Sequence, residues 1–253
     1  MPSGGRIATF TPVSTATPDL AGASAQEVLA FAVERFHPRL KTACSFQKEE
    51  SVLAHMLAEI APDATLFVID TGVLFPETLQ TWKRFEERFA LPIEVVDASS
   101  PGTPWTRENC CGQAKVDGLE QALAGVDAWV TGIRREQSET RAGAAKVAGL
   151  ERALAEVDAW VTGLRREQAP TRTATPKFEH DERRDIWKLS PLADWSEKQI
   201  WTYVFEHDLP YNPLHDEGYD SIGCAPCTLP GAGREGRWAG EDKTECGIHV
   251  VQP

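Results

Sequence analysis

The stretch "ATLFVID" at residues 64–70 is a continuous run of apolar and β-branched residues that ends in an aspartate. A run of this kind, without alternating polar residues, is typical of a strand buried on both faces of a parallel sheet. Amphipathic helical patterns stand on either side of it, at residues 49–61 and 76–90. Because helices connect neighbouring parallel strands, this order predicts an α/β fold.

The same alternation of strands and helices continues along most of the chain. The first helix should begin at Ser24, which forms a capping-box pattern with Glu27, and the last helix at Ser196. Strands are expected at residues 40–45, 91–98, 126–132, 157–163 and 185–191, and further helices at 118–125 and 196–208. The pattern predicts one α/β domain with a mainly parallel sheet covered by helices on both faces.

The ends of the chain have a different composition. Residues 1–23 are expected to form a flexible leader, and residues 24–230 the domain itself. From Tyr211 onward Gly, Pro and Cys dominate, which indicates an irregular, cysteine-rich segment. Residues 231–253 are expected to form an arginine-containing loop and a mobile tail.

One segment of the domain is duplicated. Residues 115–141 recur as residues 146–172, with 21 of 27 positions identical. Two copies do not make a solenoid, which needs at least three units. Each copy reads as one helix and one strand, so a sheet built for one such strand must gain a strand or extrude a copy. We expect one copy to pack as an appendage outside the sheet.

The overall composition excludes several classes of protein. The chain has 253 residues, of which 42% are hydrophobic, and a formal net charge of −12. A surface this acidic argues against nucleic-acid binding, whereas a local basic pocket can still attract a small anion. No run approaches the roughly 18 apolar residues of a membrane span, and the N-terminus lacks the apolar stretch of a signal peptide. We therefore expect a cytoplasmic protein without a membrane or nucleic-acid partner.

Four of the six cysteines are paired in the sequence. Cys110 and Cys111 are adjacent, whereas Cys224 and Cys227 form a C-x-x-C motif. In the cytoplasm such cysteines bind metal or catalyse more often than they form disulfides. Four thiolates suit a structural zinc or an iron–sulfur cluster, and the adjacent pair favours the cluster, whose separate irons can take neighbouring thiolates. A redox C-x-x-C motif beside an unrelated buried pair is the alternative.

The two remaining cysteines stand alone, and basic residues gather near one of them. Cys44 lies in a predicted strand and is expected in the core, whereas Cys246 is close to the C-terminus. Arg234 and Arg237 occupy a glycine-rich loop before Cys246, and Lys115 follows the cysteine pair. The sequence "RREQ" occurs in both copies of the repeat, at residues 134–137 and 165–168. Taken together, these cations favour an anion site at the carboxyl edge of the sheet, although each alone could be a solvated loop charge.

Two strand ends carry further candidate binding residues. "SFQKEES" at residues 45–51 joins a strand to a helix, where backbone N–H groups can hold a phosphate, but it lacks the glycines of a P-loop. Asp70, Thr71 and Gly72 end the next strand, at a place suited to ribose or base contacts or to a simple turn.

Together these motifs resemble the assimilatory sulfonucleotide reductases, and within that family the adenylyl-sulfate (APS) branch. The motifs follow the family order and cover residues 24–250: "SFQKEESV", "VIDTGVLFPETL", "ENCCGQAK", "DAWVTGLRREQAPTR", "PLADWSEKQIW", "YNPLHDEGYDSIGCAPCT" and "ECGIH". The resemblance implies an adenine nucleotide alpha hydrolase-like fold. It also implies a role in sulfate assimilation and cysteine biosynthesis.

The resemblance further implies a mechanism. Cys246 attacks the sulfur of APS, releases AMP and leaves an S-sulfocysteine, from which thioredoxin or glutaredoxin releases sulfite. A free thiol needs cationic neighbours to ionise at neutral pH, and the basic residues near Cys246 suit that need. The expected substrate-binding residues are Ser45, Phe46, Asp70, Thr71, Gly72, Lys115, Arg165, Arg166, Arg172, Arg234, Arg237 and His249.

The four paired cysteines also acquire a role through the resemblance. Members with these cysteines carry one 4Fe–4S cluster and usually reduce APS, whereas members without them take its 3′-phosphorylated form, PAPS. The cluster is implied to be structural and electrostatic, since thiols supply the electrons. Relatives carry the repeated unit once. We therefore assign substrate binding to Lys115 of the first copy and to three arginines of the second copy, Arg165, Arg166 and Arg172. These three are preferred to the equivalent arginines of the first copy, Arg134, Arg135 and Arg141.

Three other functions remain as alternatives. The first is PAPS reduction, and the second is a noncatalytic iron–sulfur or zinc protein that binds nucleotides. The third, an ATP-pyrophosphatase relative, predicts a Ser-Gly-Gly loop that residues 45–51 lack. The sequence is compatible with a homo-oligomer.

Overall fold

The computed structural model describes residues 19–99, 113–131, 157–168, 172–182, 185–233 and 235–237. Their seven strands form one sheet in the order β3-β2-β1-β4-β5-β7-β6. All neighbouring pairs are parallel except β6 and β7, which are antiparallel. The strands are β1 (Leu40–Ala43), β2 (Thr65–Asp70), β3 (Ile93–Asp97), β4 (Ala128–Thr131), β5 (Ala159–Thr162), β6 (Phe178–Asp181) and β7 (Ile186–Leu189).

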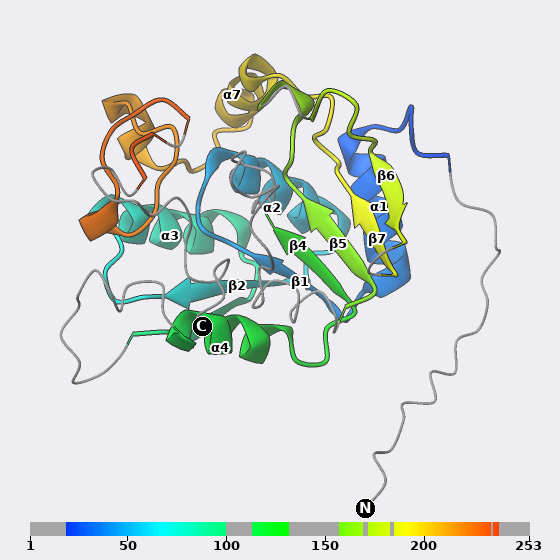
Figure 1. The fold of residues 1–253 in the computed structure, drawn as a ribbon, viewed down its shortest axis with the longest axis horizontal. Helices are drawn as coiled ribbons and strands as arrows, with labels where there is room; N and C mark the ends of the chain where they lie inside the picture. Colours follow the sequence, from blue (N-terminus) through cyan, green and yellow to red (C-terminus); the bar gives the residue numbers. More distant parts are fainter. Residues whose placement is uncertain are drawn as a thin grey trace, which may run out of the picture.

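Helices cover both faces of the sheet, as the sequence predicts. Figure 1 shows α4 on one side of the sheet and α2 and α7 on the other. The helices are α1 (Ala25–Phe36), α2 (Lys48–Ile60), α3 (Pro76–Phe89), α4 (Gln113–Leu123) and α7 (Glu197–Glu206), with short 3-10 helices η1 (Arg166–Gln168), η3 (Pro213–Glu217) and η4 (Ala225–Cys227). The predicted fold class is therefore confirmed.

Residue alternation along the strands divides the core into two layers. In β2, Leu66 and Val68 pack with α1, α2, α3 and α7, whereas Phe67 faces the layer that contains α4. Side chains of successive strand residues point to opposite faces, so a continuous apolar run fills both layers. Two of the expected helix caps are also present, because Ser24 and Ser196 both close capping boxes.

The duplicated unit contributes two strands to the sheet. β4 and β5 lie side by side in parallel, with Ala128 opposite Ala159 and Thr131 opposite Thr162. The expectation that one copy lies outside the sheet is therefore wrong. Both strands have the sequence "AWVT" and are buried at all four positions, so extruding either one would expose apolar side chains to water.

The two strands reproduce each other's packing as well as their sequence. Trp129 and Trp160 both point into the α4 layer, where their rings stack with centroids 6.3 Å apart. Val130 and Val161 both point into the opposite layer. The sheet has accommodated the repeat by inserting a strand that presents the same side chains to the same two layers.

Deleting residues 115–145 should leave a folded protein with six strands. The deletion joins Ala114 to Lys146. β1 would then pair with the "AWVT" strand β5 in place of the identical "AWVT" strand β4. We expect cooperative unfolding in urea, with a loss of at most about 3 kcal/mol in the free energy of unfolding, the range of a single harmful substitution. Loss of the cooperative transition would show that β5 cannot replace β4 beside β1.

Candidate functional site

The loop between β1 and α2 lies at the carboxyl end of a central strand. Within it, Phe46 has a φ of 61° and its side chain is almost fully buried. The ring stacks on Trp82 and meets Phe85 edge-on, with ring centroids 5.8 and 5.1 Å away. Phe46, predicted to bind substrate, therefore offers a ligand only its backbone, and its ring anchors the loop to the core.

The second residue of this loop, Ser45, is held by a glutamate of α2. Its backbone N–H donates to Glu50 Oε2 at 2.5 Å, and its hydroxyl lies 3.1 Å from both carboxylate oxygens. The neighbouring Cys44 belongs to the core, as predicted. Burial raises the pKa of the Cys44 thiol well above its usual value, and the nearby Glu50 carboxylate adds to the shift. Cys44 is therefore poorly suited to act as a nucleophile.

Asp70, Thr71 and Gly72 form the turn at the end of β2. The Asp70 Oδ1 atom accepts a hydrogen bond of 2.8 Å from the Gly72 backbone N–H. Gly72 has a φ of 70°, a conformation that residues with a side chain rarely adopt. Thr71 Oγ1 lies 3.3 Å from Cys224 Sγ. The turn therefore meets the C-x-x-C segment directly.

Several bonds fix the C-x-x-C segment against this turn. Leu74 and Cys224 form an antiparallel bridge, and the Ala225 N–H donates to the Val73 carbonyl at 2.9 Å. Cys224 and Cys227 are both buried in the α4 layer of the core. The predicted irregular chain is confirmed here, since Ala225–Cys227 is only a short 3-10 helix.

The segment before Cys224 links α2 to Arg237. The Gln47 side chain pairs with the backbone of Ile222, donating from Nε2 to the carbonyl at 3.2 Å and accepting from the N–H at 3.4 Å. On the same segment, Arg237 Nη1 donates to the Ile222 carbonyl at 3.2 Å. A Cβ atom at Gly223 would lie 2.8 Å from Arg237 Nε, which is closer than real Cβ contacts. A glycine at position 223 therefore makes room for the guanidinium.

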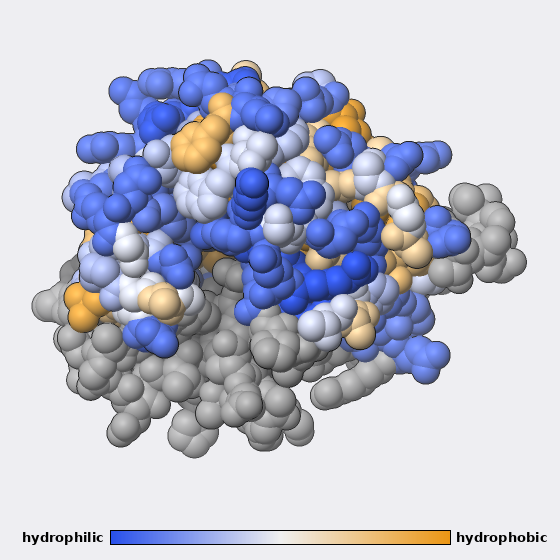
Figure 2. Space-filling view, turned by 90° about the horizontal axis from the view of Figure 1, so that it is seen from above, coloured by the Kyte–Doolittle hydropathy of each residue, from blue (hydrophilic) through white to orange (hydrophobic). Residues whose placement is uncertain are grey.

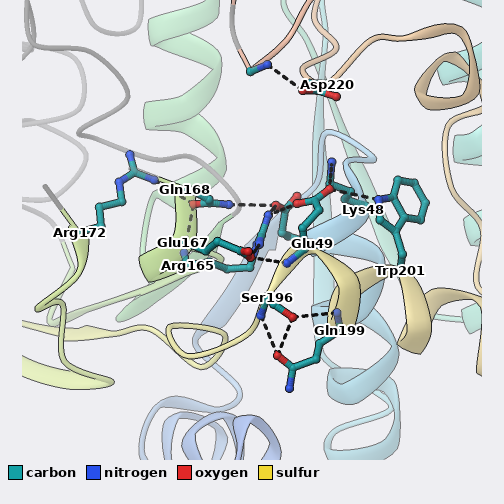
Figure 3. A network of polar contacts seen from close by, with 12 residues as sticks. Lys48, Glu49, Arg165, Glu167, Gln168, Arg172, Ser196, Gln199, Trp201 and Asp220 are labelled. Carbon is teal, nitrogen blue, oxygen red and sulfur yellow. Dashed lines mark hydrogen bonds and ion pairs between the residues drawn. The ribbon is translucent and has the colours of Figure 1, made fainter. Parts of the chain in front are cut away.

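The arginine loop after β5 is joined to α2 and α7 by a partly buried polar network (Figure 3). Arg165 donates to Glu49 from Nε at 3.3 Å and from Nη2 at 3.2 Å, and its Nη2 also donates to Glu197. Gln168 Nε2 donates to the same Glu49 oxygen at 3.0 Å. The side chains of Arg165 and Glu49 are only 3% and 6% exposed, so this is an interior ion pair.

The other two arginines of the loop also make internal bonds. Arg172 is buried and donates from Nη1 to Gln168 Oε1 at 2.9 Å. Arg166 donates from Nε to the Thr175 carbonyl at 2.8 Å. Three predicted anion-binding residues are thus brought to one edge of the sheet, and Arg165 is engaged by carboxylates of this chain.

The partners in this network are not predicted from the sequence. Lys48 is buried, forms an ion pair of 2.8 Å with Glu197, and lies 5.3 Å from the Trp201 ring centroid. Both Lys48 and Glu49 stand in the quoted stretch "SFQKEES", but their partners come from α7 and from the loop after β5. Only the fold brings these segments together, so no local pattern could have identified the network.

The remaining predicted residues are only partly described. Lys115 is half-buried in the first turn of α4. Cys110, Cys111, Arg134, Arg135, Arg141, Arg234, Cys246 and His249 lie outside the described residues. In the part of the chain that is described, no three His, Cys, Asp or Glu side chains gather as a metal site. The helices of that part include none long and apolar enough to cross a membrane.

The surface over this region is mostly polar. Figure 2 views the molecule from the side on which α7 lies in Figure 1, and hydrophilic side chains predominate there, with hydrophobic ones in small separate spots. The described side chains on this face therefore form no large continuous apolar patch of the kind that marks a docking surface.

Burial shifts the titration of one acid in the site. The pKa of Glu50 rises to about 7, mainly through desolvation, while hydrogen bonds from Ser45 and Gln47 oppose the rise. Between pH 4.5 and 7 the unfolded chain releases this proton and the folded chain keeps it. The free energy of unfolding therefore falls as the pH rises through that window, and the effect of this group levels off above it.

Glu50→Gln should remove this part of the pH dependence. Urea unfolding at pH 5 and pH 8 should show that the wild type loses roughly 2 to 3 kcal/mol more than the variant over this range, because one pKa unit corresponds to about 1.4 kcal/mol and the unfolded carboxyl is already partly ionised at pH 5. Other titrating groups cancel in the comparison. Identical losses in the two proteins would contradict an ionising, buried Glu50.

Comparisons with known proteins identify the family. The phosphoadenosine phosphosulfate reductase domain matches residues 39–146 and 142–230, and each segment contains one copy of the repeat. Curated proteins named adenosine 5′-phosphosulfate reductase are similar over most of their length. The protein from Bacillus mycoides is 39% identical over 242 residues, covering 89% of this chain and 90% of that protein. The one from Salinibacter ruber is 36% identical, covering 88% and 82%.

Solved structures agree with this relationship. A phosphoadenylyl-sulfate (PAPS) reductase from Candida auris, solved as a phosphate complex, superposes with a TM-score of 0.55 at 28% identity, covering 83% of this chain and 93% of that one. An FMN adenylyltransferase from Candida glabrata shares the fold, with a TM-score of 0.52 at 16% identity, covering 83% and 64%. The family predicted from the motifs is confirmed, and this chain belongs to the phosphoadenosine phosphosulfate reductase domain family.

Proposed function

We propose that this protein reduces adenosine 5′-phosphosulfate to sulfite and AMP in sulfate assimilation and cysteine biosynthesis. The observation that carries the proposal is its similarity to proteins named for this activity, at 36–39% identity over about nine-tenths of the chain. The structure of the site supports the proposal. The turn after β2 contacts the C-x-x-C segment through Thr71 and Cys224, and Arg237 bonds to Ile222, two residues before Cys224.

The proposed reaction has two steps, and the Cys246 sulfur takes part in both. The Cys246 thiolate attacks the sulfur of the sulfonucleotide, the bond from that sulfur to the phosphate oxygen breaks, and AMP leaves with the electron pair. An S-sulfocysteine remains on the enzyme. A dithiol protein of the thioredoxin or glutaredoxin class then attacks the Cys246 sulfur and expels sulfite. Its second thiol resolves the mixed disulfide, so the dithiol supplies both electrons.

The cations of the site have a defined role in this scheme. Arg237, with Lys115 and Arg234, offsets the repulsion between the thiolate and the anionic substrate and stabilises charge on the departing phosphate. Arg165, Arg166, Arg172 and His249 are proposed to bind substrate with them. Asp70, Thr71 and Gly72 form the turn proposed for the nucleoside, and Ser45 and Phe46 the loop beside it. The reaction is proposed to take place in the cytoplasm.

The paired cysteines are proposed to hold a 4Fe–4S cluster. Cys224 and Cys227 suit this role, because both thiols are buried and Cys224 Sγ has a hydroxyl 3.3 Å away, as metal-bound thiolates often do. Cys110 and Cys111 would complete the four ligands. Such a cluster, when bound, joins the two cysteine segments and contributes to the local electric field.

Metal analysis of anaerobically purified protein tests the cluster. We expect four irons per chain with a matching amount of acid-labile sulfide. One zinc atom per chain without sulfide would instead indicate a structural zinc site, and the proposed function would then have to be reconsidered.

PAPS is the alternative substrate, because the similar structure from Candida auris is named as a PAPS reductase. Initial rates with APS and with PAPS at matched concentrations distinguish the two. We expect a large preference for APS, and a preference for PAPS would contradict the assignment of the substrate.

Gly223→Ala should weaken substrate binding without unfolding the protein. The new Cβ atom would overlap the Arg237 guanidinium, which lies at the end of a flexible side chain and can move away. Losing one charge-assisted contact with an anion costs about 1.5–3 kcal/mol, so we expect KM for APS to rise by roughly tenfold to a hundredfold. The free energy of unfolding should change little. An unchanged KM would show that Arg237 does not contribute to substrate binding.

A further inference from the structure

The side-chain amide of Gln47 joins two segments that lie 175 positions apart in the chain. Gln47 directly precedes α2, and its side chain pairs with both backbone groups of Ile222. Nε2 donates to the Ile222 carbonyl at 3.2 Å, and Oε1 accepts from the Ile222 N–H at 3.4 Å. A primary amide can donate and accept at the same time, so it fixes a backbone unit much as a neighbouring strand does.

The Ile222 carbonyl also receives the guanidinium of Arg237. Arg237 Nη1 donates to this oxygen at 3.2 Å and to the Ser221 hydroxyl at 3.4 Å. A carbonyl oxygen has two lone pairs, so it can accept from Gln47 and Arg237 together. Both of these acceptors of the guanidinium are neutral. They therefore orient the Arg237 side chain without cancelling its charge.

The backbone at Arg237 is fixed by contacts that do not involve Gln47. Arg237 forms an antiparallel bridge with Thr228, and the Leu229 N–H donates to the Gly236 carbonyl at 2.8 Å. The path of the chain at this point therefore has its own support. Gln47 acts on the direction of the guanidinium, through the position of the Ile222 carbonyl.

A neutral residue at position 47 is significant because its neighbours are charged. Lys48, Glu49 and Glu50 follow it in the sequence, and all three are buried. At the same edge of the sheet, Arg165 is held by ion pairs with carboxylates of the chain. A carboxylate at position 47 would compete with an anionic ligand for the guanidinium, whereas an amide holds the same place without such competition.

We propose that Gln47 is a positioning residue, which acts through the Ile222 carbonyl to direct the Arg237 guanidinium toward the phosphate of the bound nucleotide. The inference rests on the proposed function, in which Arg237 binds the anionic part of the substrate. It gives the segment before α2 a role in the anion site that acts through another side chain rather than through contact with the substrate.

Titration calorimetry on the full chain tests the proposal with AMP and with adenosine, which lacks the phosphate. The proteins are wild type, Gln47→Met, Arg237→Ala and the double variant. Methionine has nearly the length of glutamine but neither its strong donor nor its acceptor. We expect Gln47→Met to raise Kd for AMP at least about threefold, but no more than Arg237→Ala does, because Gln47 acts through that side chain.

Two further results are expected from the same titrations. Adenosine should bind Gln47→Met and wild type within about twofold of each other, because the phosphate contact is absent from both complexes. In the Arg237→Ala background, Gln47→Met should cause no additional loss of AMP affinity. Such non-additivity is the signature of two residues that act as one unit, and a general loosening of the fold would not produce it.

Gln199 provides a matched control in the first turn of α7. Gln199 Oε1 accepts from the Ser196 N–H at 2.8 Å and from the Ser196 hydroxyl at 2.9 Å. The proposed site does not use Gln199, so Gln199→Met should keep Kd for AMP within about twofold of wild type.

Gln47→Glu is a second variant, which decides the matter if Gln47→Met does not fold. Its carboxylate can still accept from the Ile222 N–H, but it cannot donate to the carbonyl and it draws the guanidinium to itself. We expect it to weaken AMP binding at least as much as Gln47→Met does.

The outcomes separate this inference from the proposed function. The inference is wrong if both Gln47 variants bind AMP as tightly as wild type, if Arg237→Ala does so, or if Gln47→Met causes the same loss with and without Arg237. Sulfite release from APS is measured separately on the wild type. A wild type that binds AMP but forms no sulfite would contradict the proposed reaction, whereas the AMP titrations would still decide the role of Gln47.

Discussion

Replacing Cys246 by serine is expected to reduce sulfite production by at least about 10³-fold, with no change in AMP binding. The thiolate is the nucleophile in the proposed reaction, and a serine hydroxyl cannot ionise near neutral pH without a strong base beside it. Loss of a covalent nucleophile is among the largest effects that a single substitution has on turnover. The measurement is the initial rate of sulfite release from APS with excess thioredoxin.

Cys44→Ala is the matched control for this substitution. The Cys44 side chain is 6% exposed in the core, and burial raises the pKa of its thiol, so it should contribute nothing to the chemistry. We expect Cys44→Ala to retain wild-type turnover within a few-fold, with a modest loss of stability. Full activity in Cys246→Ser would show that another group attacks the sulfur.

Arg165→Ala should cause the largest loss of stability among the arginines of the loop. The substitution leaves Glu49 buried without its cation, although Gln168 still donates to it. Removing one partner of a buried ion pair costs about 3–5 kcal/mol, because the remaining charge is uncompensated. The measurement is the free energy of unfolding in urea at neutral pH.

Arg166→Ala serves as the control for Arg165→Ala. Arg166 is only half-buried, and its side chain donates to the Thr175 carbonyl. We expect it to cost about 1 kcal/mol, the usual net value of a single hydrogen bond. Equal losses for the two variants would contradict the assignment of Arg165 as an interior tie between the loop, α2 and α7.

Much of the fold could be predicted because local patterns and packing agree. The run at residues 64–70 became β2, with Phe67 on one face and Leu66 and Val68 on the other. By contrast, β6 was missed, since its sequence "FEHD" is rich in charge and lacks an apolar stripe. An edge strand pairs on one side only, so it tolerates such residues.

The duplication shows a limit of reasoning from one copy at a time. Each "AWVT" segment predicts a buried strand, but the sequence does not say whether a sheet can accept both. The structure shows that the sheet gains a strand, because the second copy can repeat the pairing register and the tryptophan packing of the first. That compatibility depends on three-dimensional neighbours that no local pattern contains.

The candidate site was predictable in its parts rather than in its contacts. The turn after β2 and the C-x-x-C motif were both recognisable, and their contact between Thr71 and Cys224 joins residues 153 positions apart. Arg165 was recognised as a basic loop residue, whereas its bonds to Glu49 and Glu197 depend on how α2 and α7 pack. The sequence shows which residues carry a charge, but the fold determines which residue each charge pairs with.

The central claim is tested most directly by the mass of the intact protein after reaction with APS in the absence of any dithiol. The account predicts a gain equal to one SO₃ group, located on the peptide that contains Cys246, and its disappearance with release of sulfite when thioredoxin is added. A protein that consumes APS while its mass never changes would contradict a covalent sulfur transfer to Cys246.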